Sequence, residues 1–231
     1  MVQRRPAEVG MSIDQIDTPA LVIDLNAYER NLDKMAKLIK KSDKRLRPHA
    51  KMHKSPQVTL EQMKRGAVGA CCQKVSEAEI LVEGGVADVL ITNEIVTPSK
   101  LKRVAEIAKQ ATIGICVDDA SATIELNKQC AMLDATVTAL VEIDVGGRRC
   151  GVTTPDAAVE LAKIIENASH LNFGGLQAYH GSAQHMRTPA ERSDVVENAA
   201  KIVRGTVSAL KAAGITCDIV TGGGTGTLMH D

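Results

Sequence analysis

The chain has 231 residues, with 28 basic and 28 acidic side chains and therefore no net charge. A protein that binds nucleic acid or an anionic membrane usually carries a basic surplus, so we expect neither partner. The length suits one large α/β domain or two small ones. Since the chain has two Tyr, one Phe and no Trp, its core must be built from Val, Ile, Leu and Ala.

The N-terminal residues show no apolar stretch of signal-peptide type, and no apolar run approaches the ~20 residues of a membrane span. We therefore expect a cytoplasmic protein. Its six cysteines lack CxxC spacing, and most lie in apolar runs such as VGACCQ and TIGICV. This pattern predicts buried thiols in a reducing compartment.

Eight short apolar runs alternate with longer segments of helical pattern. The runs cover residues 20–25, 45–49, 68–73, 88–93, 112–117, 136–143, 173–179 and 217–221. The run RLRPH at 45–49 is the weakest strand prediction, because it holds a proline and two arginines. Helix N-caps are predicted at Asn26, Ser55, Ser76 and Thr154.

This βα rhythm predicts an α/β fold, a (β/α)8 TIM barrel, because apolar strands covered by helices are typical of parallel sheets. An open doubly wound sheet is the alternative. No G-x-G-x-x-G follows the first run, which weakens the dinucleotide-fold interpretation. In a barrel the function lies where the strands end, so the residues after each run are the candidates.

The stretch RPHAKMHKS, residues 47–55, follows the second run. Period-two alternation places His49, Lys51 and His53 on one face. The stretch is a solvated basic turn, a metal site built on the two histidines, or a lysine placed for chemistry. The metal interpretation is the weaker one, because no carboxylate or cysteine is adjacent. A lysine amine can form an imine with a carbonyl when its site is partly desolvated.

The stretch TGGGTGT, residues 221–227, follows the eighth run. Glycines let backbone N–H groups approach a ligand, and the loop after the last barrel strand commonly binds phosphate. We therefore predict a phosphate cradle, with a flexible loop as the alternative. A cofactor that carries both a phosphate and an aldehyde needs a cradle and an amine, so this loop favours the chemical interpretation of Lys51.

Two further loops offer polar side chains. DVGGRRCGV supplies Arg149, which can hydrogen-bond a ring oxygen or a carboxylate, or simply form a surface salt bridge. QAYHGSAQH supplies Tyr179, His180 and His185. Tyr179 is expected to stack or hydrogen-bond in the site. The two histidines are expected to contact the substrate or to belong to a polar loop.

Six segments occur in a familiar order: TPALVIDLNAYERNL, RPHAKMHKS, CCQKVSEAEIL, VEIDVGGRRCGV, GLQAYHGSAQH and TGGGTGT. Together they resemble the fold-type III pyridoxal-phosphate enzymes of the D-threonine aldolase and D-serine dehydratase group. The motifs CCQKVSEAE and GLQAYHGSAQHM are most similar to those of the 3-hydroxy-D-aspartate aldolases. The resemblance covers about residues 16 to 227.

The resemblance implies a barrel of the alanine-racemase N-terminal-domain type that binds pyridoxal 5'-phosphate at its mouth. It implies that Lys51 is the Schiff-base lysine, with Lys54 as the fallback and His49 and His53 as its catalytic neighbours. Gln73, Arg149 and Tyr179 would contact the cofactor ring. The phosphate would lie on Gly222, Gly223, Gly224, Thr225 and Gly226.

The resemblance also implies domain bounds: an N-terminal extension at 1–15, the cofactor-binding barrel at 16–227 and a tail outside the family at 228–231. Relatives continue into a C-terminal β-domain that would hold a divalent metal (Mn, Mg or Zn). We expect no metal ligands in this chain, since His230 and Asp231 come too early. Without that domain we expect poor activity and poor stability.

The activity implied is a lyase reaction, the cleavage of 3-hydroxy-D-aspartate or D-threonine to glycine and an aldehyde by a homodimer. One alternative is a dehydratase of D-serine or D-3-hydroxyaspartate on the same cofactor. Another is a non-catalytic protein that only binds pyridoxal phosphate.

Overall fold

The computed structural model describes residues 6–230 and divides the chain into two compact units, one up to Lys44 and one from Arg45 onward. The N-terminal unit holds a 3-10 helix, η1 (Ile13–Gln15), and one α-helix, α1 (Leu25–Lys40). Residues 20–24 form no strand, so the strand predicted at 20–25 is wrong. The reason is that an apolar run needs a partner strand, and here Leu21, Val22 and Ile23 are exposed.

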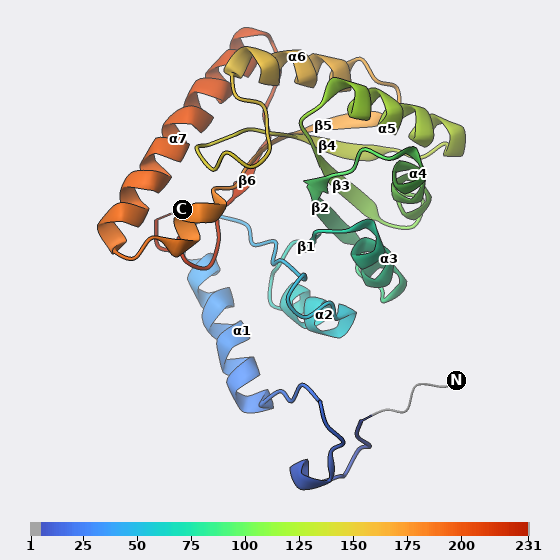
Figure 1. The fold of residues 1–231 in the computed structure, drawn as a ribbon, viewed down its shortest axis with the longest axis vertical. Coiled ribbons are helices and arrows are strands. Elements are labelled where there is room, and N and C mark those ends of the chain that lie inside the picture. Colours follow the sequence, from blue (N-terminus) through green and yellow to red (C-terminus); the bar gives the residue numbers. More distant parts are fainter. Residues whose placement is uncertain (1–5, 231) are drawn as a thin grey trace. The chain divides into compact units, whose positions relative to one another are not determined.

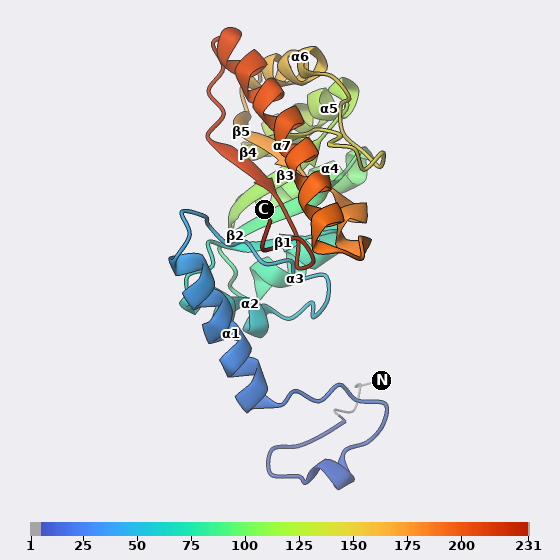
Figure 2. The same cartoon turned by 90° about the vertical axis from the view of Figure 1, so that its left-hand side faces the viewer.

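The second unit is built on one six-stranded, all-parallel sheet with the strands in chain order (Figure 1). The strands are β1 (Ala70–Cys72), β2 (Asp88–Glu94), β3 (Thr112–Val117), β4 (Val137–Glu142), β5 (Leu171–Ala178) and β6 (Ile219–Gly222). The last six predicted runs are therefore confirmed as strands. Figure 2 shows the twist that accumulates from β1 to β5.

The α-helices of this unit alternate with the strands and cover the outer side of the sheet, whereas a 3-10 helix lies at the carboxyl ends of the strands (Figure 1). They are α2 (Pro56–Lys64), α3 (Val75–Glu83), α4 (Pro98–Ile107), α5 (Ala120–Leu133), α6 (Pro155–Glu166), the 3-10 helix η2 (Gly181–His185) and α7 (Pro189–Ala212). Leu101, Leu126 and Ile165 from three of these helices share one buried cluster with Ile115 and Val141 of the strands. Removing this apolar surface from water is the main force that holds helices and sheet together.

The inner side of the sheet carries a second, smaller cluster. It consists of Cys71, Leu90 and Leu140, with Ile219 packed against it. Successive side chains of a strand point to opposite faces. Glu142, two residues after Leu140, therefore points to the same inner side at the carboxyl end of β4.

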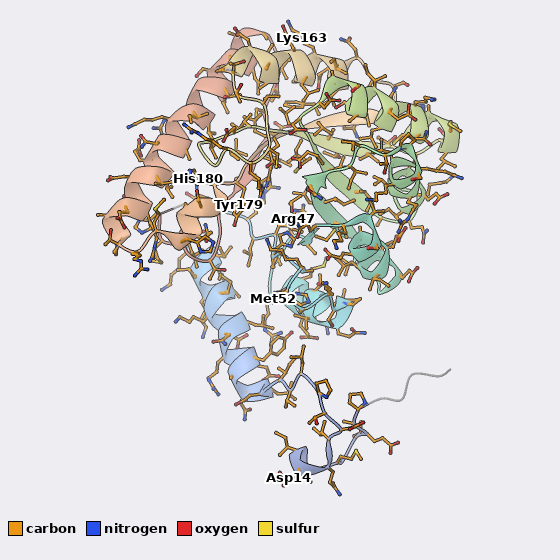
Figure 3. The ribbon with its side chains drawn as sticks, in the orientation of Figure 1. Asp14, Arg47, Met52, Lys163, Tyr179 and His180 are labelled. Carbon is orange, nitrogen blue, oxygen red and sulfur yellow. The ribbon has the colours of Figure 1, made fainter. Side chains whose placement is uncertain are left out.

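The closed eight-stranded barrel is not observed in the described residues, where the sheet is an open half-barrel of the α/β-barrel type. The strand predicted at 45–49 is reduced to an isolated bridge between His49 and Cys71. Pro48 accepts a hydrogen bond from Cys71 N (2.8 Å) but has no N–H to return. The segment still lies along β1, and Arg47 fastens it to Asp88 of β2 through a 2.6 Å ion pair (Figure 3).

Two of the four predicted N-caps are confirmed. Ser55 Oγ accepts from Val58 N (3.4 Å) at α2, and Thr154 Oγ1 accepts from Ala157 N (3.2 Å) at α6. The predictions at Asn26 and Ser76 are wrong, because both residues lie inside the first helical turn. The caps there are Asp24 and Lys74.

All six cysteines are free thiols, four of them buried, as the sequence predicted. Within residues 6–230, no helix combines the length and the apolar character that crossing a bilayer requires.

Candidate active site

A pocket of about 440 Å3 lies at the carboxyl ends of the strands in the second unit. This volume falls within the range of about 300–1,000 Å3 that is usual for small-molecule sites. Four predicted site residues line it: Lys51, Arg149, Tyr179 and His185. The other lining residues are Glu142, Asp144, Gly147, Cys150, Gly181 and Ser182.

Lys51 follows the segment that runs along β1. Its backbone N–H donates to His49 Nδ1 (3.2 Å), and His49 Nε2 lies 3.1 Å from Thr92 Oγ1. Burial, and then the positive charge of Lys51, lower the pKa of His49 to about 4. His49 is therefore neutral near pH 7, and its two ring nitrogens fix the turn that presents Lys51.

His53, predicted beside Lys51, lies one turn further along. Its Nδ1 accepts from Ser55 N (3.0 Å), while its Nε2 is buried and has no hydrogen-bond partner among the described residues. Burial lowers the pKa of His53. Neither His49 nor His53 is among the residues that line the pocket.

Lys54 and Gln73 both contact Glu77, and neither residue lines the pocket. Lys54 has a left-handed backbone (φ 52°), and its Nζ lies 3.9 Å from Glu77 Oε1. The backbone N–H of Gln73 donates to Glu77 Oε2 (2.9 Å). Lys51 is thus the lysine of this stretch that reaches the pocket, whereas the predicted ring contact of Gln73 has no counterpart among the lining residues.

The loop after β4 is shaped by its own backbone contacts. Asp144 Oδ1 accepts from the N–H groups of Gly146 (2.9 Å) and Arg148 (3.0 Å), and these hydrogen bonds lower the pKa of Asp144. Gly151, whose φ of 100° suits only glycine, donates from its backbone N–H to Asp118 Oδ2 (2.9 Å). Such bonds restrict the loop and with it the position of Arg149.

Arg149 makes two contacts inside the pocket. One of its terminal nitrogens lies 3.3 Å from Glu142 Oε1. Its guanidinium carbon lies 5.3 Å from the centre of the Tyr179 ring, within the range of a cation–π interaction. Tyr179 and His180 come from the loop that follows β5 (Figure 3). Two loops that are distant in sequence therefore meet at Arg149.

Glu142, which the sequence analysis did not single out, is the most buried acidic residue of the pocket. It is 2% exposed. Its Oε2 and Glu94 Oε1 are buried without a hydrogen-bond partner among the described residues. Burial, and then the neighbouring Glu94, raise the pKa of Glu142 to about 7. An acidic residue at the end of the apolar run TVTALVEI was the available signal.

Glu94, Glu142 and Cys150 are also the one group of three potential metal-binding side chains that residues 6–230 bring together. Their ligand atoms lie within 4.8 Å of one another. His230 belongs to no such group, and Asp231 lies outside the described residues.

The glycine loop lines a different, smaller cavity of about 30 Å3, to which Gly223 and His180 contribute. Different residues of the segment 178–185 line the two cavities, so the two lie on either side of this segment. Gly226 N donates to Gln184 Oε1 (2.7 Å), and a Cβ at Gly224 would lie 2.6 Å from Gln184 Cδ. The loop is close-packed on η2, and its predicted grip on phosphate stays a prediction, as does the part of Gly222 and Thr225 in it.

The pocket suits the expected cofactor in its chemistry. It offers one amine for an aldehyde, one guanidinium for an oxygen anion and one phenol ring. Glu142, which also lines the pocket, leaves its Oε2 buried without a hydrogen-bond partner among the described residues, so this wall of the pocket is polar.

Comparisons with known proteins agree with this geometry. The family model of the alanine racemase N-terminal domain matches residues 23–231. The chain is 44% identical over 226 residues to a D-threonine aldolase of Arthrobacter sp, covering 98% of this chain and 60% of the relative. It is 45% identical over 228 residues to the 3-hydroxy-D-aspartate aldolase of Paracoccus denitrificans strain Pd 1222, covering 98% and 59%.

Among solved structures, D-threonine aldolase from Filomicrobium marinum superposes with a TM-score of 0.96 at 46% identity. The match covers 99% of this chain and 62% of that one. The resemblance drawn from the sequence motifs is thus confirmed. The chain spans about three-fifths of the length of the relatives that it matches.

Proposed function

Because the chain belongs to the alanine racemase N-terminal domain family, we propose that it forms the pyridoxal-phosphate-binding part of a lyase. The reaction would cleave a D-3-hydroxy amino acid, 3-hydroxy-D-aspartate or D-threonine, to glycine and an aldehyde. One structural observation carries the proposal, the meeting of Lys51, Arg149 and Tyr179 in a single pocket. The similarity to two named aldolases supports the choice of substrate class.

Lys51 would hold the aldehyde carbon of the cofactor through its Nζ. Arg149 would donate to an oxygen on the ring, and the Tyr179 ring, already beneath the guanidinium, would limit how the cofactor plane lies. The glycine loop 222–226 would receive the phosphate. When bound, pyridoxal phosphate supplies an electron sink for the charge left by Cα–Cβ cleavage.

The residues of the chain supply placement and proton transfer. His185 lines the pocket and offers a ring nitrogen to the proton of the substrate's 3-hydroxyl group. His180 is less available, because its Nδ1 already accepts from Ala183 N (3.2 Å). His49 stays neutral and holds the turn of Lys51, since both its ring nitrogens have partners.

The product identifies the reaction. The purified chain is supplied with pyridoxal phosphate and manganese and then incubated with 3-hydroxy-D-aspartate or with D-threonine. Glycine together with glyoxylate or acetaldehyde is expected at a low rate, because the sequence resemblance implies metal ligands that this chain does not carry. Oxaloacetate or another 2-oxo acid would instead show a dehydratase, and cofactor binding without any product would show a binding protein. A chelator arm tests the divalent metal, which we expect to be required.

The homodimer and a cofactor-binding unit at residues 16–227 remain proposals drawn from the sequence resemblance, and the cytoplasmic location remains a proposal drawn from the apolar pattern of the sequence. Light scattering of the purified chain measures the first of them directly.

A further inference from the structure

Glu94 and Glu142 lie close together, with ligand atoms within 4.8 Å of each other, and Glu142 lines the pocket. Glu142 is the last residue of β4, and Glu94 is the last residue of β2. The register of β2 against β3 shifts after Ile91, so that Glu94 pairs with Cys116. Because of this irregularity, Glu94 lies beside Cys116 of β3, and Cys116 in turn pairs with Leu140 of β4.

Glu142 is buried and Glu94 is half-buried, and one oxygen of each lies buried without a hydrogen-bond partner among the described residues. Oxygens of the two carboxylates lie within 4.8 Å of each other, so the pair is not stable when both groups are ionised. Like charges at one site raise one of the two pKa values strongly, because ionising the second group means adding charge beside charge. Leaving two buried oxygens without any hydrogen bond adds the cost of removing each of them from water. A single proton removes both problems, since one carboxyl then donates to the other.

We propose that Glu94 and Glu142 share one proton, through a bond between Glu94 Oε1 and Glu142 Oε2, and that this singly charged pair positions Arg149. The pair then carries one negative charge against the single positive charge of the guanidinium. The 3.3 Å separation of Arg149 and Glu142 Oε1 is longer than the ~2.7–2.9 Å of a strong charge-assisted bond. Arg149 is therefore held loosely enough to keep its place over Tyr179.

The surroundings of the pair contain few other charges. Cys116 faces it from β3, where burial, and then Glu142 and Glu94, raise the pKa of that thiol. β5 presents the neutral Gln177, which is in register with Glu142. The remaining titratable or charged groups near the pair are those of the pocket: Arg149, Cys150, Lys51 and Asp144.

Loss of the shared proton would leave both carboxylates charged and would change the position of Arg149. Two full negative charges would draw the guanidinium toward the carboxylates and away from the Tyr179 ring. Arg149 is thus expected to be set for ligand binding while the pair holds its proton, and to be pulled back at higher pH. This last step rests on the proposed function of Arg149 as a cofactor contact.

Carbon-13 NMR of the full chain labelled at the glutamate side-chain carboxyl tests the proton directly. The wild-type protein is expected to show a carboxyl resonance that titrates near neutral pH. Glu94→Gln and Glu142→Gln should each abolish that titration. Glu83→Gln, which removes an exposed carboxylate from α3, is the matched control and should leave it unchanged.

Two outcomes overturn the shared proton. Either every glutamate of the wild-type chain titrates only at acid pH, or the neutral titration survives in both variants of the pair. A third outcome replaces the proton by a metal: the resonances of both glutamates move on adding zinc ions, without any neutral titration. Circular dichroism of each variant ensures that a lost signal does not reflect a lost fold.

A second experiment tests whether the pair positions Arg149: the affinity of the chain for pyridoxal phosphate is measured between pH 6 and pH 8. Wild-type affinity is expected to fall severalfold over this range. Glu94→Gln, whose amide imitates the protonated acid, should bind with an affinity that stays constant. An equal fall in both proteins overturns the positioning role. Absence of cofactor binding at any pH would instead defeat the proposed function, while the NMR titration would still report on the pair.

Discussion

Lys51 and Lys54 are three residues apart, yet they occupy different surroundings. Lys51 lines the pocket, whereas the Nζ of Lys54 lies 3.9 Å from Glu77 Oε1. The difference arises from one residue with a left-handed backbone, Lys54 itself (φ 52°), which turns the chain between the two side chains. Period-two alternation, on which the sequence-based prediction rested, places Lys51 and Lys54 on opposite faces of an extended strand. The backbone between these residues forms a turn, so the two lysines are separated by the turn and not by alternation.

The first prediction follows from this separation. Lys51→Ala is expected to abolish the absorbance band of protein-bound pyridoxal phosphate, because the amine that holds the aldehyde is gone. Lys54→Ala, the matched control from the same turn, should retain the band. Borohydride reduction followed by peptide mass spectrometry should find the label on Lys51. A label on Lys54 would show that the pocket lysine has been misassigned.

Arg149 and Tyr179 were both expected in the site, but their mutual contact was not. Their sequence positions say nothing of the 5.3 Å between guanidinium and ring. The same holds for Glu142, which the loop after β4 brings within reach of Arg149.

At the scale of elements, eight strands were predicted, and six of them are observed in the described residues. The apolar run 20–25 forms no strand, and the run 45–49 keeps a single bridge. An isolated strand gains little without a neighbour, because its backbone groups stay unpaired. The pattern in a sequence shows which residues favour a strand, but not whether a partner strand is present.

The glycine loop allows a second test at this scale. Gly223→Val is expected to weaken the binding of pyridoxal phosphate at least tenfold, about 1.4 kcal/mol, if the loop receives the phosphate. Gly214→Val is the matched control, since both glycines have φ 77° and both variants carry the same backbone strain. A Cβ at Gly214 meets no atom within 4 Å.

Equilibrium titration of each variant with the cofactor gives the two affinities, and urea unfolding gives the two stabilities. The control should lose stability but keep the wild-type affinity. If both variants bind as the wild-type chain does, the phosphate is held elsewhere, for example within the pocket that Lys51 lines.

At the scale of the whole molecule, buried titratable groups act on stability in opposite directions. The pKa of Glu142 is raised to about 7, so the stability that its protonated form contributes is lost as pH rises from about 4.5 to about 7. The pKa of His49 is lowered to about 4 from its ordinary 6.5. Between pH 4 and pH 6.5 the unfolded chain binds more protons at His49 than the folded chain does, so the stability that neutral His49 contributes is lost as pH falls from 6.5 to 4.

The third prediction concerns this acid side. His49→Gln should reduce the loss of unfolding free energy between pH 6.5 and pH 4, because the unfolded chain no longer gains a proton at this position. His170→Gln serves as the control, since His170 hydrogen-bonds Ala135 O (3.1 Å) outside the pocket. Urea unfolding at a series of pH values measures the slope. An unchanged slope in His49→Gln would mean that His49 is protonated as readily in the folded chain as in the unfolded one.

The sequence by itself determined the βα order, six of the strands, two helix caps and the presence of Lys51, Arg149, Tyr179 and His185 at one end of the sheet. These features depend on local periodicity, on capping chemistry and on the rule that parallel strands end at one edge. Only the tertiary structure decided that the sheet is an open half-barrel in the described residues, that the glycine loop packs on Gln184, and that Glu94 meets Glu142. Each of these depends on a strand register or a pairing between distant segments, and a register shift of two residues between β2 and β3 changes which β2 side chain lies near Glu142. No pattern within a single strand encodes such a shift.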